Sequence, residues 1–364
     1  MAYPQRRAAL RELLGTAAPA LDALLVTDLV NVRYLTGFTG SNAALLVHVA
    51  GDHTSRFCTD GRYRTQTELE VPDLPILIER GSARALAAIA PESGVAVLGF
   101  ESDHVTVDDR DGLAAAATGI ALHRAPGLVQ RLRTVKDDAE TTALRVACAA
   151  ADAALADLLS EGGLRPGRAE RMVALDLEER MRDHGATGPA FATIVAAGAN
   201  SAIPHHRPGA TELRRGDLVT MDFGALVDGY HSDMTRTVVL GPATDWQREL
   251  YALVGAAQQA GRAALAPGTK LADVDAAART VVERAGHAEQ FVHPLGHGVG
   301  LQIHEAPLLA ATSEGTLAAG MVLTVEPGVY LPGRGGVRTE DTLLVRDGEP
   351  LLLTLSPREL LEIS

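Results

Sequence analysis

Short hydrophobic runs alternate with helical stretches in the N-terminal part of the chain. From about residue 23 to residue 124, β-rich runs such as ALLVT and AALLVHV are separated by Ala- and Leu-rich stretches such as SARALAAIA. This alternation predicts an α/β domain. The charged segment RLRTVKDDAE then leads into a long helical pattern that ends near Gly162. We therefore expect an N-terminal domain over residues 1–130 and a second domain over residues 131–364.

The second domain contains an internal repeat. The segment LRPGRAERMVALDLEERMRDHG is matched about a hundred residues later by LAPGTKLADVDAAARTVVERAG, and each consists of a Pro-Gly turn, an amphipathic helix and a closing Gly. A strand pattern follows in both copies, RRGDLVTMDFG and AAGMVLTVEPG. Asp222 and Glu326 occupy the same place in the two strands. The repeat therefore predicts two related halves with one acid at each equivalent position.

The first strand is followed by a hairpin signal. Asp228-Gly229 supplies the residue types that a tight turn with positive φ requires. If the strands pair around positions 227 and 228, Asp222 and Asp233 face each other with Cβ atoms roughly 5 Å apart. Two carboxylates placed in this way repel each other unless a cation lies between them.

A second pair of acids and three histidines complete the pattern. Glu326 ends the second apolar strand, and Glu340 follows a Pro- and Gly-rich loop. The segment HPLGHGVGLQIHEAP adds His293, His297 and His304. Any one of these acids could be a solvated charge at a strand edge, but four in two matched hairpins indicate one shared site. Carboxylates with an imidazole suit Mn²⁺, Co²⁺ or Fe²⁺, and two such ions can activate a water molecule and polarise a carbonyl.

Composition narrows the class of protein. The hydrophobic content of 46% and the charged content of 22% are those of a globular protein. A formal charge of −13 argues against a nucleic-acid or anionic-membrane partner. Cys58 and Cys148 cannot form a disulfide framework, and no apolar run reaches membrane-spanning length. The N-terminus lacks the pattern of a secretory signal, so we expect a cytoplasmic protein.

These motifs, together with NVRYLTGFTGSN and TDGRYRTQ near the N-terminus, resemble the pita-bread metallopeptidases of family M24, specifically the prolidase and aminopeptidase P branch. The resemblance implies a smaller α/β N-terminal domain and an α+β pita-bread catalytic domain with internal pseudo-two-fold symmetry. It also implies a homodimer or homotetramer and two divalent ions, Mn²⁺ before Co²⁺, Fe²⁺ or Zn²⁺. The implied metal ligands are Asp222, Asp233, His297, Glu326 and Glu340.

The resemblance also implies roles around the metals. His205, in NSAIPHHRP, corresponds to a histidine near the substrate's proline, and His293 and His304 to histidines that contact the scissile carbonyl and the proline side. Glu326 would accept a proton from the attacking water, and His304 or His293 would help to stabilise the oxyanion. Arg338 resembles an arginine that orients the metal-binding carboxylates, although a surface arginine in a Gly-rich hairpin is an equal alternative.

The choice between an aminopeptidase and a dipeptidase depends on how the enzyme binds the part of the substrate that follows the proline. A strict dipeptidase must bind the free carboxylate of Xaa-Pro, usually through an arginine. Here HEAP is followed by Leu308 and Leu309, and no Arg or Lys occurs until Arg334. We therefore expect an Xaa-Pro aminopeptidase that acts on proline-containing peptides. An Xaa-Pro dipeptidase is the alternative, because Arg334, Arg207 or an arginine of another subunit could substitute. A non-catalytic peptide- or protein-binding module remains a third possibility, and the N-terminal motifs argue against a methionine aminopeptidase.

Overall fold

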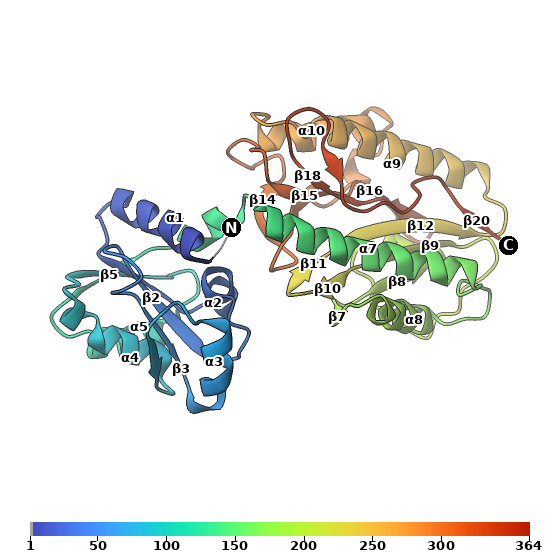
Figure 1. The fold of residues 1–364 in the computed structure, drawn as a ribbon. Coiled ribbons are helices and arrows are strands. Elements are labelled where there is room, and N and C mark those ends of the chain that lie inside the picture. Colours follow the sequence, from blue (N-terminus) through green and yellow to red (C-terminus); the bar gives the residue numbers. More distant parts are fainter. Residues whose placement is uncertain (1–2) are drawn as a thin grey trace. The chain divides into compact units, whose positions relative to one another are not determined.

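The computed structural model describes residues 3–364, and the chain divides into two compact units after Arg133 (Figure 1). Each unit has its own hydrophobic core. None of the helices within the described residues is both long enough and apolar enough to cross a membrane.

The N-terminal unit is a mixed six-stranded sheet in the order β4-β3-β2-β1-β5-β6. Strand β1 pairs antiparallel with β2 and parallel with β5. Leu86 of α4 and Leu113 of α5 share a buried cluster with Leu25 and Leu46 of the sheet, so these helices cover one face. The strands are β1 (Ala23–Val26), β2 (Ala43–His48), β3 (Arg56–Thr59), β4 (Ile76–Ile78), β5 (Val97–Phe100) and β6 (Ala121–Arg124). The helices are α1 (Tyr3–Thr16), α2 (Leu29–Thr36), α3 (Arg64–Glu70), α4 (Ser82–Ile89), α5 (Val107–Ala116) and α6 (Leu128–Arg133).

The C-terminal unit is built from two copies of one arrangement. In the first, α7 and α8 pack together and precede the antiparallel strands β8, β9 and β12. In the second, α9 and α10 pack together and precede the antiparallel strands β13, β15 and β18. Figure 1 shows the two helix pairs beside the strands. The repeat read from the sequence is thereby confirmed as an internal pseudo-two-fold arrangement.

The first copy contains α7 (Asp138–Ser160), α8 (Glu170–Asp183), β7 (Gly188–Pro189), β8 (Ile194–Ala197), β9 (Leu218–Phe223), β10 (Ala225–Val227), β11 (Tyr230–His231) and β12 (Met234–Leu240). The second contains α9 (Asp245–Ala263), α10 (Leu271–Arg284), β13 (Gly296–Gly298), β14 (Glu305–Leu309), β15 (Val322–Val325), β16 (Gly328–Leu331), β17 (Gly335–Arg338) and β18 (Asp341–Leu344). The short strands β19 (Leu351–Leu352) and β20 (Glu362–Ile363) add to the sheet edges beside β18 and β12.

The long first helix of each copy begins at a capping box. Asp137 accepts hydrogen bonds from the first turn of α7, and Glu140 accepts one from the Asp137 backbone. Thr244 and Gln247 form the corresponding box at α9. These side chains bond backbone groups that the helix itself leaves unpaired, which fixes where each helix starts. The helices then bury their apolar faces against the sheet strands.

The first hairpin turns at Asp228 and Gly229, as its sequence predicted. Both residues have positive φ, 48° and 76°. Because these two residues form the centre of the turn, Val227 pairs with Tyr230 and the register places Asp222 opposite Thr235. The predicted pairing of Asp222 with Asp233 is therefore wrong by two residues.

Candidate metal centre and its cavity

A cavity of about 500 Å³ lies in the C-terminal unit. The side chains around it come from β8, β9, β13, β14, β17 and the connecting segments of both copies. All nine candidate residues of the sequence analysis line it, namely His205, Asp222, Asp233, His293, His297, His304, Glu326, Arg338 and Glu340. Residues that are more than 130 positions apart in the chain thus meet in one place, and the fold brings both hairpins to the same site.

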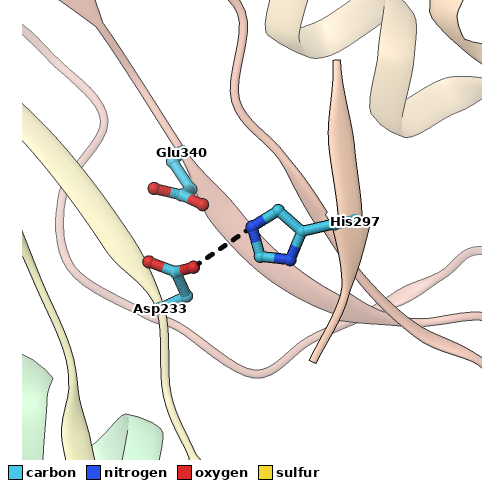
Figure 2. A group of neighbouring side chains, drawn as sticks. All are labelled: Asp233, His297 and Glu340. Atoms are coloured by element: carbon cyan, nitrogen blue, oxygen red, sulfur yellow. Dashed lines mark ion pairs between the residues drawn. The ribbon is translucent and has the colours of Figure 1, made fainter. Parts of the chain in front are cut away.

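Three buried side chains converge in this cavity. Figure 2 shows Asp233, His297 and Glu340 pointing toward one another, with one potential ligand atom of each lying within 4.8 Å of the others. The His297 Nε2 atom lies 3.5 Å from Asp233 Oδ2 and 3.4 Å from Glu326 Oε1. These separations are too long for strong hydrogen bonds and leave space for a cation between the groups.

The tautomer of His297 suits metal binding. Its Nδ1 atom lies 3.0 Å from the carbonyl oxygen of Gly298, which can only accept a hydrogen bond, so Nδ1 carries the proton. Burial lowers the pKa of His297 to about 4, which keeps the ring neutral. The Nε2 lone pair is consequently directed to Asp233 and Glu326, as a metal-ligating histidine requires.

Unbonded carboxylate oxygens provide a direct test of whether a cation fits. Among the described residues, Asp222 Oδ1 and Glu340 Oε1 are buried and accept no hydrogen bond. Burial and the neighbouring carboxylates raise the pKa values of Asp233 and Glu340 well above the usual range. Burial also raises the pKa of Glu326 to about 8. Burying several ionised carboxylates without a counter-ion is energetically unfavourable. The oxygen-rich set of ligand atoms therefore fits divalent metal ions.

Arg338 connects the acids of the two hairpins. It is 3% exposed, which excludes the alternative of a surface arginine. Its Nη2 atom donates to Asp222 Oδ2 at 2.5 Å, and its Nε atom donates to Thr235 Oγ1 at 3.0 Å. The Thr235 hydroxyl donates in turn to Glu340 Oε2 at 2.7 Å. A single guanidinium therefore orients one carboxylate directly and another through a hydroxyl group.

The histidines around the cavity differ in their hydrogen bonding. His293 Nδ1 donates to the Pro294 carbonyl at 2.8 Å, and its Nε2 atom lies 2.9 Å from the hydroxyl of Tyr330. Arg338 can only donate, so the Tyr330 hydroxyl accepts from it and gives its own proton to His293 Nε2. Burial lowers the pKa of His293 to about 4, which agrees with a neutral ring. The ring nitrogens of His205 and His304 form no hydrogen bonds within residues 3–364.

Sequence reasoning missed several residues that support the site. Thr235 and Thr324 donate to metal-side carboxylates. The threonines could have been found by strand alternation, because a residue two positions from Asp233 or Glu326 shares its face of the strand. Lys136 lies 2.9 Å from Glu305 in a buried ion pair, and no local pattern pointed to a partner so distant in sequence.

The comparisons with known proteins agree with this geometry. Residues 142–347 match the model of metallopeptidase family M24, and residues 6–135 match that of the creatinase/prolidase N-terminal domain. The chain belongs to metallopeptidase family M24, and it has the pita-bread fold preceded by a creatinase-type α/β domain. It is a metal-dependent exopeptidase, and its family implies divalent metal ions.

Particular relatives match the chain from end to end. An Xaa-Pro dipeptidase of Pyrococcus furiosus is 33% identical over 94% of this chain and 96% of its own. The structure of an Xaa-Pro dipeptidase from Bacillus anthracis has 37% identity and a TM-score of 0.93, covering 98% of this chain and 99% of the other. An X-Pro aminopeptidase from Thermotoga maritima has 30% identity and a TM-score of 0.88, covering 96% and 99%.

Proposed function

We propose that this protein is an Xaa-Pro dipeptidase. The observation that carries the proposal is the buried cluster of Asp233, His297 and Glu340, in a chain similar over nearly its whole length to proteins named Xaa-Pro dipeptidase. The expectation of an aminopeptidase rested on the absence of an arginine after HEAP, and these relatives favour the dipeptidase alternative instead. Aminopeptidase activity is the second candidate, because one similar structure carries that name. The family's metallopeptidase chemistry argues against a non-catalytic module.

The proposed metal ligands are the four carboxylates and one imidazole that meet in the cavity. These residues would hold two divalent ions, which would lower the pKa of a water molecule and polarise the substrate carbonyl. We propose Mn²⁺, since a carboxylate-rich site with one imidazole suits that ion. A homodimer or homotetramer, a cytoplasmic location and domain limits at residues 1–130 and 131–364 remain predictions. The proposed ligands are Asp222, Asp233, His297, Glu326 and Glu340.

The remaining residues of the cavity position the substrate and move protons. Glu326, whose Oε1 atom accepts a hydrogen bond from Thr324 at 3.2 Å, accepts the proton of the attacking water and returns it to the leaving proline nitrogen. His304 has no other hydrogen-bond partner within residues 3–364, so it can donate to the carbonyl oxygen as negative charge develops there. His205 contacts the proline side. His293 Nε2 already accepts the proton of the Tyr330 hydroxyl, so His293 does not donate a hydrogen bond to the substrate. Instead, His293 and Arg338 orient the neighbouring side chains of the cavity.

The carboxylate of a dipeptide requires a cationic partner in addition to Arg338. Arg338 is already bonded to Asp222, and it is the one arginine or lysine that lines the cavity within the described residues. Arg334 stacks on Trp246, with the guanidinium carbon 4.2 Å from the ring centroid. Arg207 is exposed and lies two positions from His205, so we propose it as the partner of the substrate carboxylate.

The test compares two substrates on one preparation. The protein is stripped of metal, reloaded with Mn²⁺ and assayed on Gly-Pro and Gly-Pro-Gly, with Asp233→Ala as the inactive control. We expect cleavage of the dipeptide and little cleavage of the tripeptide. The Arg207→Ala variant should raise KM for the dipeptide, and Arg334→Ala should not. Efficient cleavage of the tripeptide would instead support an Xaa-Pro aminopeptidase. The absence of metal-dependent cleavage of either substrate would reject both proposed activities.

A further inference from the structure

A fully buried carboxylate holds the segment that carries His205. Glu170, the first residue of α8, has 0% exposure. Its Oε1 atom accepts hydrogen bonds from the Ala197 backbone N–H at 2.9 Å and from Asn200 Nδ2 at 2.8 Å. Its Oε2 atom lies 2.8 Å from His206 Nε2 and accepts from the Gly209 N–H at 3.2 Å. Both oxygens are therefore used, and every donor lies between residues 197 and 209.

The backbone beside Glu170 fixes the end of the same segment. The N–H of Glu170 donates to the Thr211 carbonyl at 2.9 Å, and the N–H of Arg171 donates to the Gly209 carbonyl at 3.1 Å. The start of the segment follows strand β8, where Ala197 is bonded to the Glu170 carboxylate. Hydrogen bonds from the start of helix α8 thus hold the connection between β8 and β9 at its beginning, near its middle and at its end.

His205 lies within this segment, residues 197–209, but forms no hydrogen bond of its own in the described part of the chain. The residues on either side are the ones that are held. Arg338 Nη1 donates to the Pro204 carbonyl at 3.3 Å, and His206 is bonded to Glu170. The position of His205 at the cavity is consequently set by its neighbours, because the backbone that carries a side chain limits the rotamers that the side chain can adopt.

We propose that Glu170 and His206 are positioning residues for catalysis, which hold His205 at the substrate-binding cavity. The inference rests on the proposed Xaa-Pro peptidase function and assigns a role to two residues that do not line the cavity. The second half of the unit has a comparable device in which Glu305 is held by Lys136 and accepts from the Gln302 N–H at 2.9 Å, next to His304. In both halves a buried carboxylate therefore steadies the segment that bears an unbonded histidine.

The ionised form of Glu170 is the form that the contacts require. Burial alone would raise the pKa of Glu170, but the hydrogen bonds from Asn200, Ala197, His206 and Gly209 outweigh burial and lower it. An ionised carboxylate accepts at both oxygens. Glutamine has nearly the same shape, but its amide group would face at least one donor, so Glu170→Gln should disturb the segment with little change in volume.

The test uses steady-state kinetics on the Mn²⁺-loaded enzyme with its best Xaa-Pro substrate. We expect Glu170→Gln to lower kcat/KM by about 10- to 100-fold, as a small displacement of a substrate-contacting group does. His206→Leu should behave in the same way. His206→Gln keeps an N–H donor for Glu170 and should recover most of the activity. Metal content should be unchanged in all three variants.

A double-mutant cycle separates positioning from general destabilisation. The cycle is run with Arg207→Ala in every variant, which removes the other proposed substrate contact of the segment. If Glu170 acts through His205, adding Glu170→Gln to His205→Ala should then lower kcat/KM by less than about twofold further. Glu101→Gln is the matched control, because Glu101 is a buried carboxylate of the N-terminal unit that accepts from Thr27, Asp28 and Asn31. It should lower the melting temperature but leave the kinetics of the folded enzyme unchanged. The control thus compares Glu170 with another buried acid that has different neighbours.

A second readout does not depend on activity. The ring signal of His205 in a protein labelled with ¹³C at histidine Cε1, assigned with His205→Ala, should shift or broaden in Glu170→Gln and in His206→Leu. Additive losses in the cycle, or an unchanged His205 signal, would overturn the positioning role. A wild-type protein that cleaves no Xaa-Pro substrate would instead reject the proposed function, and the His205 signal would still decide whether the segment is held by Glu170.

Discussion

The two acid-bearing hairpins of the catalytic unit share a sequence pattern but differ in register. In the first hairpin, Asp222 lies opposite Thr235, and Asp233 is displaced from it by two positions. In the second hairpin, Val325 pairs with Asp341 before the acids and Gly328 pairs with Arg338 after them. Glu326 and Glu340 lie between these two ladders and are paired in neither, because the Glu326 N–H donates to the Leu295 carbonyl and the Glu340 N–H donates to the Thr235 carbonyl. One half therefore offsets its two carboxylates by two positions along the strands, and the other carries its two acids in the gap between two separate ladders.

This difference gives the two halves unequal roles. The offset leaves Thr235 beside Asp222, where its hydroxyl reaches across to Glu340 of the other hairpin at 2.7 Å. Thr324, in contrast, donates at 3.2 Å to Glu326 of its own hairpin, and its oxygen accepts from the His297 N–H at 3.0 Å. The threonine of the first hairpin thus supports an acid of the second, whereas the threonine of the second hairpin supports an acid of its own hairpin. Pseudo-symmetry of the fold produces an asymmetric centre in which each carboxylate has a distinct environment.

Removing one acid from each hairpin should have the largest effect. Asp233→Ala and Glu340→Ala each delete a member of the central cluster, so we expect loss of bound metal and a fall in kcat of at least about 10³-fold in both. Metal content by mass spectrometry and Gly-Pro hydrolysis measure the two effects. Glu314→Ala, at an exposed acid of the second half, is the control and should retain both. Full activity in either cluster variant would show that its hairpin does not hold the metals.

Arg338 joins the hairpins, and its loss should be the next largest effect. Arg338→Met removes the bond to Asp222 and the bond to Thr235, so we expect kcat/KM to fall by about 100-fold with partial loss of metal. Arg338→Lys should not restore activity, because one ammonium group cannot reproduce the fork of a guanidinium. Arg334→Met, on the same hairpin, is the matched control. Equal activities of the two methionine variants would argue against this role for Arg338.

The pattern of acids could be predicted from the sequence, but their register could not. Flanking residues such as LVTM before Asp222 and MVLTV before Glu326 are local, and local alternation identifies buried strands. Register depends on which residues occupy the centre of a turn. Placing the centre of pairing between residues 227 and 228, rather than at Asp228-Gly229, moved the predicted partner of Asp222 by two positions.

The contacts between residues far apart in the sequence were the other feature of the site that sequence patterns did not predict. Glu170 reads as an ordinary acid at the start of a helix, and its four donors become visible when the chain from 197 to 209 folds over it. Lys136 and Glu305 are separated in the same way. Such contacts have no fixed spacing, because they depend on tertiary packing rather than on the period of a helix or strand.

The two threonines offer the sharpest way to compare the hairpins. Thr235→Val removes the hydroxyl that links Arg338 to Glu340, so we expect about a tenfold weaker retention of metal and a similar fall in kcat/KM. Thr324→Val has nearly the same shape change but disturbs His297 and Glu326 within one hairpin. In combination with Arg338→Met, Thr235→Val should be non-additive and Thr324→Val additive. Competition with a chelator measures the metal affinities, and the opposite pattern of additivity would reverse the assignment.

The smallest expected effect is a pH dependence of the metal-free protein. Burial raises the pKa of Glu326 to about 8, whereas the same carboxyl has a value near 4.5 in an unfolded chain. Between these values the folded state binds a proton that the unfolded state has lost, so the free energy of unfolding falls as pH rises through about 8. His293 and His297 act in the opposite sense, but their pKa values near 4, against 6.5 when unfolded, confine that gain to lower pH.

The window from pH 6.5 to 8 therefore isolates the carboxylates. In a chelator, we expect the melting temperature to fall across this window by on the order of a few degrees. Saturating Mn²⁺ should abolish the decline, because a bound cation stabilises the ionised carboxylates, and loading at pH 7 should release protons. Glu326→Gln cannot ionise and should reduce the slope of the metal-free profile, while Glu314→Gln should leave it unchanged. A melting temperature that rises with pH in the chelator would show that these acids are already ionised in the empty centre, and that the two hairpins tolerate their mutual repulsion without metal.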